Sequence, residues 1–350
     1  MNNYLGVGSL KLTEQQSIAA AVDQWITGIP GRIPGHVIFV ENPEHTAYAK
    51  TLAGEGSTIL VLNGDKEDPD IVPVRGSFDV GGEELLVDGT LNLEIQDYLA
   101  IPFVNLVGVT VVRITTEQDW QAFFDDAEQA RISGHFVHQL TEVNAVLAER
   151  GLLSGATRDT LMLARLHIAA DGSIRTGPYG STIGRVGDVI TDLRVRAIAL
   201  RPESAVAAVY YPWDIQDSPA AKPWIPRYLA ALDAWKFVPR QDRDSTRLVG
   251  FGLSLYGASI SDPLARATAP FILKRGMDHT LLDTATGRLF KVGQDAAAII
   301  EAVSNIGNVS AAATKVAPTL NVTAATAEES AHAVLARFAQ LGVDILGTRS

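Results

Sequence analysis

Three short apolar runs near the end of the chain give the clearest pattern in the sequence. The runs FILKR (271–275), HTLLD (279–283) and RLFKV (288–292) have the length and the residue types of β-strands. Residues 284–287, with the sequence TATG, supply a turn between the last two runs. The pattern therefore predicts a three-stranded antiparallel meander.

Three segments of helical character follow this predicted meander. They cover residues 295–305, 310–317 and 326–342. In the last segment, Thr326 and Glu329 have the S/T-x-x-E spacing of a capping box, which predicts a helix that starts at Thr326. Apolar residues at spacings of three and four, from Ala327 to Leu341, form a stripe that can pack on the meander. Three strands followed by three helices predict a winged helix-turn-helix domain.

The first 265 residues show a different pattern, typical of mixed α/β structure. The runs GHVIFVEN (35–42) and STILVLNG (57–64) predict buried strands. Residues 43–54 between them begin with Pro and end with Gly, as a short helix does, so a β-α-β unit is expected. The segment ELLVDGTLNLE (84–94) alternates on both sides of an Asp-Gly pair, which predicts a hairpin.

A second strand and helix pair is expected further along this region. Residues 106–115 read as a strand, and residues 116–131 have helical spacing with Thr116 placed to cap the helix. The length of the region allows two subdomains. We therefore expect a large N-terminal mixed α/β domain.

The distribution of charge supports a boundary between the two regions. The chain of 350 residues has a formal net charge of −11. Residues 271–350 hold seven basic and seven acidic residues, so the acidic excess lies before them. Residues 261–263 (Ser-Asp-Pro) supply a turn at the change in composition. We therefore expect a mixed α/β domain over 1–265 and a winged-helix domain over 266–350.

Composition also narrows the classes of function and the compartment. The chain has no Cys, which excludes disulfides, thiolate metal sites and a cysteine nucleophile. The first residues carry no targeting pattern, and no apolar run reaches the length of a membrane span, so we expect a cytoplasmic protein without a membrane partner. The acidic balance argues against a nucleic-acid partner, and Lys315 is the single base in the predicted helix-turn-helix segment 310–324.

One segment has the spacing of a metal-binding helix face. His135, His138 and Glu142 occur at i, i+3 and i+7 and would share one face of a helix. The sequence identifies no further ligands, and it contains neither a P-loop nor a dinucleotide-binding fingerprint. Our expectation is therefore that the protein has no metal and no cofactor.

The C-terminal pattern resembles a known family. The run HTLLDTATGRLFKVGQDAAAIIEAV (279–303), the two helices after it and the sequence FAQLGVDIL (338–346) are similar to the PqqD-like domain, the recognition element of pathways that modify ribosomally made peptides. The resemblance covers about 80 residues and implies a domain that binds the leader of a precursor peptide. It carries no catalytic signature.

The predicted meander can bind a peptide for a physical reason as well. An edge strand has unpaired N–H and C=O groups, so an extended peptide can join it as a further strand. The resemblance implies the same location, between the third strand and the last helix. The residues expected to contact the leader are Arg288, Leu289, Phe290, Lys291, Val292, His332, Leu335 and Ala336. For Leu289, Phe290 and Leu335, core packing is an equally good interpretation.

The layout of the whole chain resembles the recognition proteins of daptide biosynthesis. This implies a precursor whose C-terminal Thr is oxidatively decarboxylated by a partner tailoring enzyme, such as an alcohol-dehydrogenase-like oxidase. Two hypotheses follow. In the first, the protein is a non-catalytic peptide-binding subunit; in the second, its α/β domain is itself a peptide-modifying enzyme guided by the fused recognition element. The absence of a cofactor motif favours the first.

Overall fold

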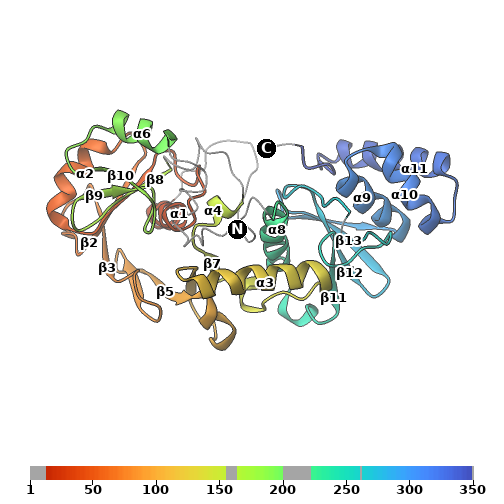
Figure 1. Cartoon of the computed structure of the whole chain (residues 1–350), viewed down its shortest axis with the longest axis horizontal. Coiled ribbons are helices and arrows are strands. Elements are labelled where there is room, and N and C mark those ends of the chain that lie inside the picture. Colours follow the sequence, from red (N-terminus) through yellow and green to blue (C-terminus); the bar gives the residue numbers. More distant parts are fainter. Residues whose placement is uncertain (1–12, 155–163, 200–221, 261, 349–350) are drawn as a thin grey trace. The chain divides into compact units, whose positions relative to one another are not determined.

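The structure is a computed structural model that describes residues 13–154, 164–199, 222–260 and 262–348. Its described residues form two compact units. Of the described residues, 13–123, 144–154 and 164–199 belong to the ten-stranded unit, and 124–143, 222–260 and 262–348 belong to the four-stranded unit. The structure is therefore mixed α/β, with a large sheet and a separate antiparallel sheet packed with helices (Figure 1).

The ten-stranded unit contains a mixed sheet in the order β10-β9-β8-β1-β2-β3-β4-β5-β6-β7. Strands β8, β1, β2 and β3 run parallel, and so do β5, β6 and β7; the remaining neighbours are antiparallel. The strands are β1 (Val37–Val40), β2 (Thr58–Leu62), β3 (Val72–Gly76), β4 (Glu84–Val87), β5 (Leu91–Asp97), β6 (Val109–Arg113), β7 (Ala145–Leu147), β8 (Arg165–Ile168), β9 (Ser173–Arg175) and β10 (Thr182–Arg185).

Helices cover both faces of the large sheet. Helix α1 packs with the core on one face, while α2 and α6 pack with the core on the other. The helices of this unit are α1 (Glu14–Thr27), α2 (Thr46–Leu52), α4 (Arg150–Leu153) and α6 (Ile190–Ala199), with short 3-10 helices at Pro43–His45 (η1) and Tyr98–Phe103 (η2). Helix α3 (Glu117–Ser133) contributes residues to both units.

Several predictions for this unit are confirmed. β1, α2 and β2 form the expected β-α-β unit with parallel strands. β4 and β5 form the expected hairpin, with Asp88 and Gly89 at φ angles of 51° and 67°. Those positive angles suit an Asp-Gly turn because its twist matches that of the flanking strands. Thr116 also caps α3, since its hydroxyl accepts a hydrogen bond from the N–H of Asp119 at 3.1 Å.

The four-stranded unit contains an antiparallel sheet in the order β11-β12-β13-β14. Strands β12, β13 and β14 confirm the predicted meander, and β11 adds a strand that the sequence pattern did not identify. The strands are β11 (Thr246–Val249), β12 (Phe271–Arg275), β13 (Asp278–Asp283) and β14 (Arg288–Val292). The expected boundary between residues 265 and 266 lies in the segment from β11 to β12, within this unit.

Helices pack on both faces of the smaller sheet. Helices α9, α10 and α11 share a core with Ile272 and Leu281 (Figure 1). On the opposite face, Arg227 of α8 lies over the ring of Phe271, 3.4 Å from its centroid. The helices are α8 (Ile225–Lys236), α9 (Gln294–Ile306), α10 (Val309–Leu320) and α11 (Ala324–Gln340), with 3-10 helices at Gln139–Thr141 (η3) and Arg240–Asp242 (η5).

The predicted start of the last helix is wrong. Helix α11 begins at Ala324, and Thr323 is its cap, with its side chain accepting a hydrogen bond from the N–H of Thr326 at 3.2 Å. The physical reason is the end of the preceding helix. Asn321 closes α10 in the left-handed conformation, so the chain is free to place the cap of the next helix, Thr323, two residues later.

None of the helices in the described ranges combines the length and the apolar run that crossing a bilayer requires.

Candidate functional site

Strand β14 forms one edge of the four-stranded sheet. It pairs with β13 in antiparallel register, with Phe290 opposite Leu281 and Leu289 opposite Leu282. Within the described residues, no strand pairs with its other side. The outward N–H and C=O groups of such an edge can accept a further strand. β14 therefore has the geometry that peptide addition requires.

The side chains of β14 alternate between a buried and an open face. Phe290 and Val292 are half-buried and pack against the core that contains α9 and α11. Leu289 points to the opposite face and is 55% exposed, and Lys291 on that face is also exposed. The alternation follows from the two-residue period of a strand. A peptide alongside β14 would thus meet one apolar face and one open face.

Helix α11 borders the buried side of β14. The ring of Phe338 contacts the ring of Phe290 edge to face, with centroids 5.8 Å apart. Leu335, one turn earlier, is half-buried against the same core, whereas His332 and Ala336 are exposed. His332 lies about 9 Å before Phe338 along the helix axis. Ala336 and His332 therefore lie on the exposed surface of α11.

Arg288 is held in place by groups of its own unit. Its guanidinium donates to the carbonyl oxygen of Leu341 at 2.8 Å and to the carboxylate of Asp283 at 3.2 Å. The Asp283 side chain is 9% exposed, so this ion pair has one buried partner. Arg288 therefore joins β14 to the end of α11, a structural role that the sequence pattern did not reveal.

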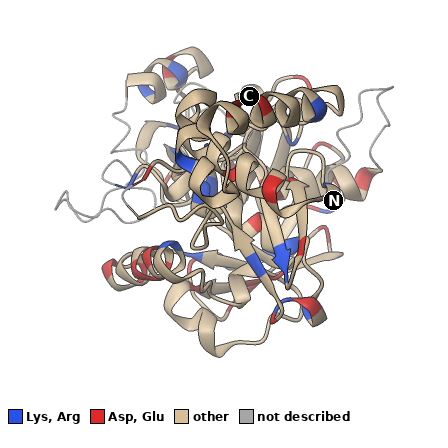
Figure 2. Ribbon diagram, turned by 90° about the vertical axis from the view of Figure 1, so that its right-hand side faces the viewer, with Lys and Arg blue, Asp and Glu red and all other residues tan. Residues whose placement is uncertain are grey.

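Lys291 is the cation of β14 that is available to a partner. Among the described residues it forms neither an ion pair nor a side-chain hydrogen bond. Figure 2 shows basic positions scattered among acidic ones, not a continuous basic stripe. The electrostatic contribution of this edge to a guest strand therefore comes from one exposed ammonium group.

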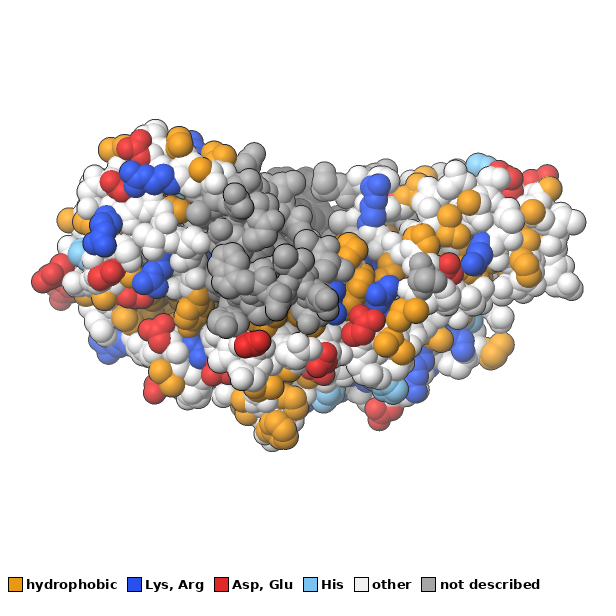
Figure 3. Space-filling model, in the orientation of Figure 1, with side chains coloured by type: hydrophobic (Ala, Val, Ile, Leu, Met, Phe, Trp, Pro, Cys, Tyr) orange, Lys and Arg blue, Asp and Glu red, His pale blue; other side chains and the backbone are white. Residues whose placement is uncertain are grey.

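The surface around the C-terminal helices mixes apolar and charged groups. Figure 3 shows hydrophobic side chains lying between scattered charged ones over this part of the chain. Isolated apolar side chains are normal on a protein surface, so the position of Leu289 beside an open strand edge is the informative feature.

The structure brings most of the predicted contact residues together around one edge. Arg288, Leu289, Phe290, Lys291 and Val292 are consecutive on β14, and Leu335 packs against the same core as Phe290. The sequence prediction of the site left out Phe338, which contacts β14 directly. Its place in the apolar stripe of the last helix was the signal that could have identified it. Peptide binding by these residues stays a prediction.

The predicted helical face with His135, His138 and Glu142 does not form. α3 ends at Ser133, and the next helical segment is the short η3. Glu142 lies 3.4 Å from Nε2 of His138, but it is paired more closely with Arg240 and Arg243, each at 2.8 Å. Burial raises the pKa of Glu142, but these two arginines outweigh it and leave the pKa below its usual value. Among the described residues, no group of His, Asp and Glu side chains has the arrangement of a metal site.

Residues 210–235, which hold three of the five tryptophans and could by their sequence form either an aromatic surface for a partner or a small core, are only partly described. Residues 210–221 lie outside the described ranges, but Trp224 and Trp235 are buried in the four-stranded unit. Tyr228, between them, stacks with Phe136 at a centroid distance of 6.0 Å. For the described part, the tryptophans therefore belong to a core and do not form an exposed aromatic surface.

A His-carboxylate pair lies at the ends of two parallel strands in the described part of the ten-stranded unit. His167 Nε2 lies 2.7 Å from a carboxylate oxygen of Glu41, whose other oxygen accepts from the N–H of Ala170 at 2.6 Å. The hydrogen bond with His167 lowers the pKa of Glu41. However, His167 is 4% exposed and stacks on Phe39. The pair therefore links β1 to β8 and leaves the imidazole little access to a substrate.

No protein-family model, curated protein sequence or solved structure matches this chain. The function is consequently inferred from the geometry and chemistry of the molecule itself.

Proposed function

We propose that this protein binds the leader of a ribosomally made precursor peptide in the cytoplasm and presents the peptide to a tailoring enzyme. In this proposal residues 266–350 act as a PqqD-like recognition element with a winged helix-turn-helix topology. The leader adds to the open side of β14 as an extended strand. The protein is the binding subunit and leaves the chemistry to its partner.

The observation that carries this proposal is that no described strand pairs with the outer side of β14, close to the apolar residues Leu335 and Phe338 of α11. Main-chain hydrogen bonds along β14 supply affinity that does not depend on the peptide sequence. Alternate side chains of the guest meet the region of Phe290 and Leu335, which supplies the preference for apolar residues. Lys291 adds attraction for an acidic leader.

Holding the leader gives the partner enzyme a kinetic advantage. When the leader is bound, the attached core peptide stays near the active site at an effective concentration of the order of mM for a short flexible linker. In a daptide-type pathway this partner is an alcohol-dehydrogenase-like oxidase that acts on the C-terminal Thr of the precursor. The recognition protein itself needs no cofactor for this role.

Hydrogen exchange with a leader peptide tests the proposal. The probe is a synthetic leader from a short precursor gene adjacent to the gene for this protein, and a scrambled leader is the control. We expect the leader to slow amide exchange within 288–292, because the outward N–H groups of β14 become hydrogen-bonded. Saturable binding of the leader without protection of β14 would show that the site is elsewhere.

A mass measurement separates the binding role from catalysis. The purified full chain is incubated with the whole precursor, with and without the oxidase and its nicotinamide cofactor. We expect the precursor mass to change only when the oxidase is present. A change of mass in the presence of this chain and cofactor alone would establish that its α/β unit is itself a peptide-modifying enzyme.

A further inference from the structure

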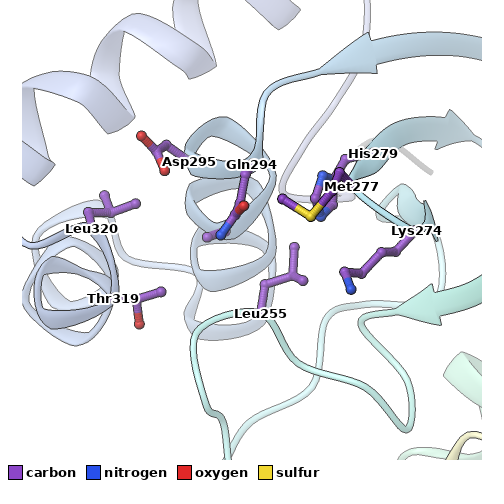
Figure 4. A pocket seen from close by; sticks show the side chains of 9 residues that line it. Leu255, Lys274, Met277, His279, Gln294, Asp295, Thr319 and Leu320 are labelled. Carbon is purple, nitrogen blue, oxygen red and sulfur yellow. The ribbon is translucent and has the colours of Figure 1, made fainter.

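A pocket of about 220 Å³ lies at the end of the smaller sheet where α9 begins. Lys274, Met277 and His279 border it from the β12–β13 hairpin, and Gln294, Asp295 and Ala298 border it from α9 (Figure 4). Leu255, Thr319 and Leu320 complete the lining. None of these residues belongs to the predicted peptide site, so the pocket is a separate feature of the four-stranded unit.

His279 is the unusual residue of this pocket. It is 3% exposed, and neither of its ring nitrogens has a hydrogen-bond partner within the described part of the chain. A buried imidazole without partners is unfavourable, since buried polar groups are normally hydrogen-bonded. The register of β13 fixes its position, with Lys274 opposite on β12 and Val292 opposite on β14. A bound ligand would supply the missing partner.

Two features make the electrostatic potential in this pocket positive, the side chain of Lys274 and the N-terminal end of α9. Lys274 lines the pocket and forms no ion pair with a described residue. The first turn of α9 also borders it, and Gly293 caps this 13-residue helix without a side-chain hydrogen bond. Uncapped N–H groups and the helix dipole both favour an anion at that end. In Figure 4 the carboxylate of Asp295 points away from Lys274, so it leaves this side of the pocket to donors.

The remaining lining defines the shape and polarity of the ligand. Leu255, Ala298 and Leu320 are apolar, and Met277 at the rim is 81% exposed, so its flexible thioether can close over a ligand. The pocket is smaller than the cavities of about 300–1,000 Å³ that hold drug-sized ligands. A singly charged carboxylate needs only two or three donors, and the Asp295 carboxylate in the same helical turn repels it less strongly than it would repel a phosphate dianion.

We infer that this pocket binds the carboxylate of a small molecule with an apolar body, with Lys274, His279 and the start of α9 holding the carboxylate. The inference goes beyond peptide binding at β14 and does not depend on it. A site of this size and donor set suits an acylated amino acid or a short branched carboxylic acid. A carboxylate bound there would hydrogen-bond the ring of His279.

Titration of the full chain with N-acetyl-leucine tests this inference. The protein has three methionines, so labelling their methyl groups with ¹³C gives three NMR signals, of which Met277 is assigned with Met277→Leu. We expect N-acetyl-leucine to shift the Met277 signal saturably, with a Kd in the millimolar range, about −4 kcal/mol at 1 mM. N-acetyl-leucinamide, which has the same body without the charge, should bind at least about tenfold more weakly.

The variant Lys274→Gln tests the role of the lysine. Lys274 is partly exposed, so its replacement leaves the core intact. We expect this variant to lose at least about tenfold in affinity for N-acetyl-leucine, with an unchanged affinity for the leader peptide. Three results would overturn the inference: no shift up to about 20 mM acid, equal binding of the amide, or tighter binding of inorganic phosphate. Equal binding by Lys274→Gln and the natural protein would overturn it as well.

Discussion

The ring of Phe338 in α11 stands edge to face against the ring of Phe290 in β14, with their centroids 5.8 Å apart. This contact joins the last helix to the open edge strand of the smaller sheet. Phe338 is buried, while Phe290 is half-buried on β14, the edge strand of the sheet. The pair therefore fixes how α11 packs against the strand to which we propose that a leader peptide adds.

Replacing Phe338 with Ala should destabilise the protein and loosen the packing of α11 on β14. We expect the free energy of unfolding to fall by about 3 kcal/mol, because the change removes a buried aromatic ring and leaves a cavity. Phe338→Leu, which keeps most of the apolar volume, should cost about 1 kcal/mol. Urea denaturation measures both. A loss for Phe338→Ala as small as for Phe338→Leu would mean that α11 repacks without this ring.

Lys291→Glu should weaken leader binding without lowering stability. Lys291 is exposed and has no ion pair among the described residues, so its replacement breaks no internal contact. We expect affinity for an acidic leader to fall about tenfold, corresponding to about 1.4 kcal/mol. Fluorescence anisotropy with a labelled leader measures the change. Lys66→Glu, which alters an exposed lysine of the ten-stranded unit by the same charge, is the control.

If the Lys291→Glu and Lys66→Glu variants bound the leader with equal affinity, the proposal that the leader binds at β14 would be contradicted. The melting temperature of both variants should stay at that of the natural protein, which excludes unfolding as a cause of any loss.

Arg288 should behave differently from Lys291 although the two lie on the same strand. Its guanidinium bridges Asp283 and the carbonyl oxygen of Leu341, so Arg288→Met should reduce stability by about 1 kcal/mol, a modest value because the side chain is 43% exposed. Arg337→Met is the matched control, since Arg337 is exposed on α11 and has no such bridge among the described residues. Identical unfolding curves for these two variants would contradict the bridging role.

Glu301 should make stability depend on pH. Burial raises the pKa of Glu301 to about 7, against the partial compensation of the Leu255 N–H and other donors. The folded protein then keeps a proton that the unfolded chain loses near pH 4.5. The stabilising contribution is fully present below pH 4.5 and is lost as pH rises through 7, by about 3 kcal/mol in total. Urea denaturation from pH 4 to 9 measures this slope.

Glu301→Gln is the control for this pH dependence. Gln keeps an oxygen that can accept from the Leu255 N–H, which lies 2.7 Å from the Glu301 carboxylate, but it cannot ionise. We expect the fall in stability between about pH 5 and 8 to disappear in this variant. The same slope in both proteins would assign the dependence to other groups.

Gly252 should be intolerant of a side chain because of its neighbours at the C-terminal end of α3 and just after it. Its φ is +82°, and an added Cβ would lie 2.4 Å from the Cα of Gly134 and from the carbonyl oxygen of Ala130. We expect Gly252→Ala to lower the free energy of unfolding by about 3 kcal/mol. Gly257→Ala has a similar φ of +76° but open space, so it should cost about 1 kcal/mol. Thermal unfolding compares the stability of the two variants. Equal losses of stability would show that the C-terminal end of α3 can move away from residue 252.

The local pattern of the sequence determined much of the secondary structure. The apolar runs 271–275 and 288–292 became strands with those bounds, and Asp88-Gly89 became the predicted hairpin turn. These outcomes depend on side-chain periodicity and on the φ angles that a short segment prefers, both of which are visible along the chain. The start of α11 was misplaced because both Thr323 and Thr326 can cap a helix, and the end of α10 selected the first.

The tertiary structure alone decided which side chains are free and which are engaged. Arg288 is engaged because Leu341, 53 residues later, offers it a carbonyl oxygen, whereas Lys291 on the same strand forms no ion pair with a described residue. His279 is buried and has no hydrogen-bond partner among the described residues, because the register of β13 sets it beside Lys274 and the start of α9. Such pairings join residues that are distant in the chain, so the local pattern of apolar and polar residues does not predict them. The order of the strands and the packing of the helices determine which residues meet.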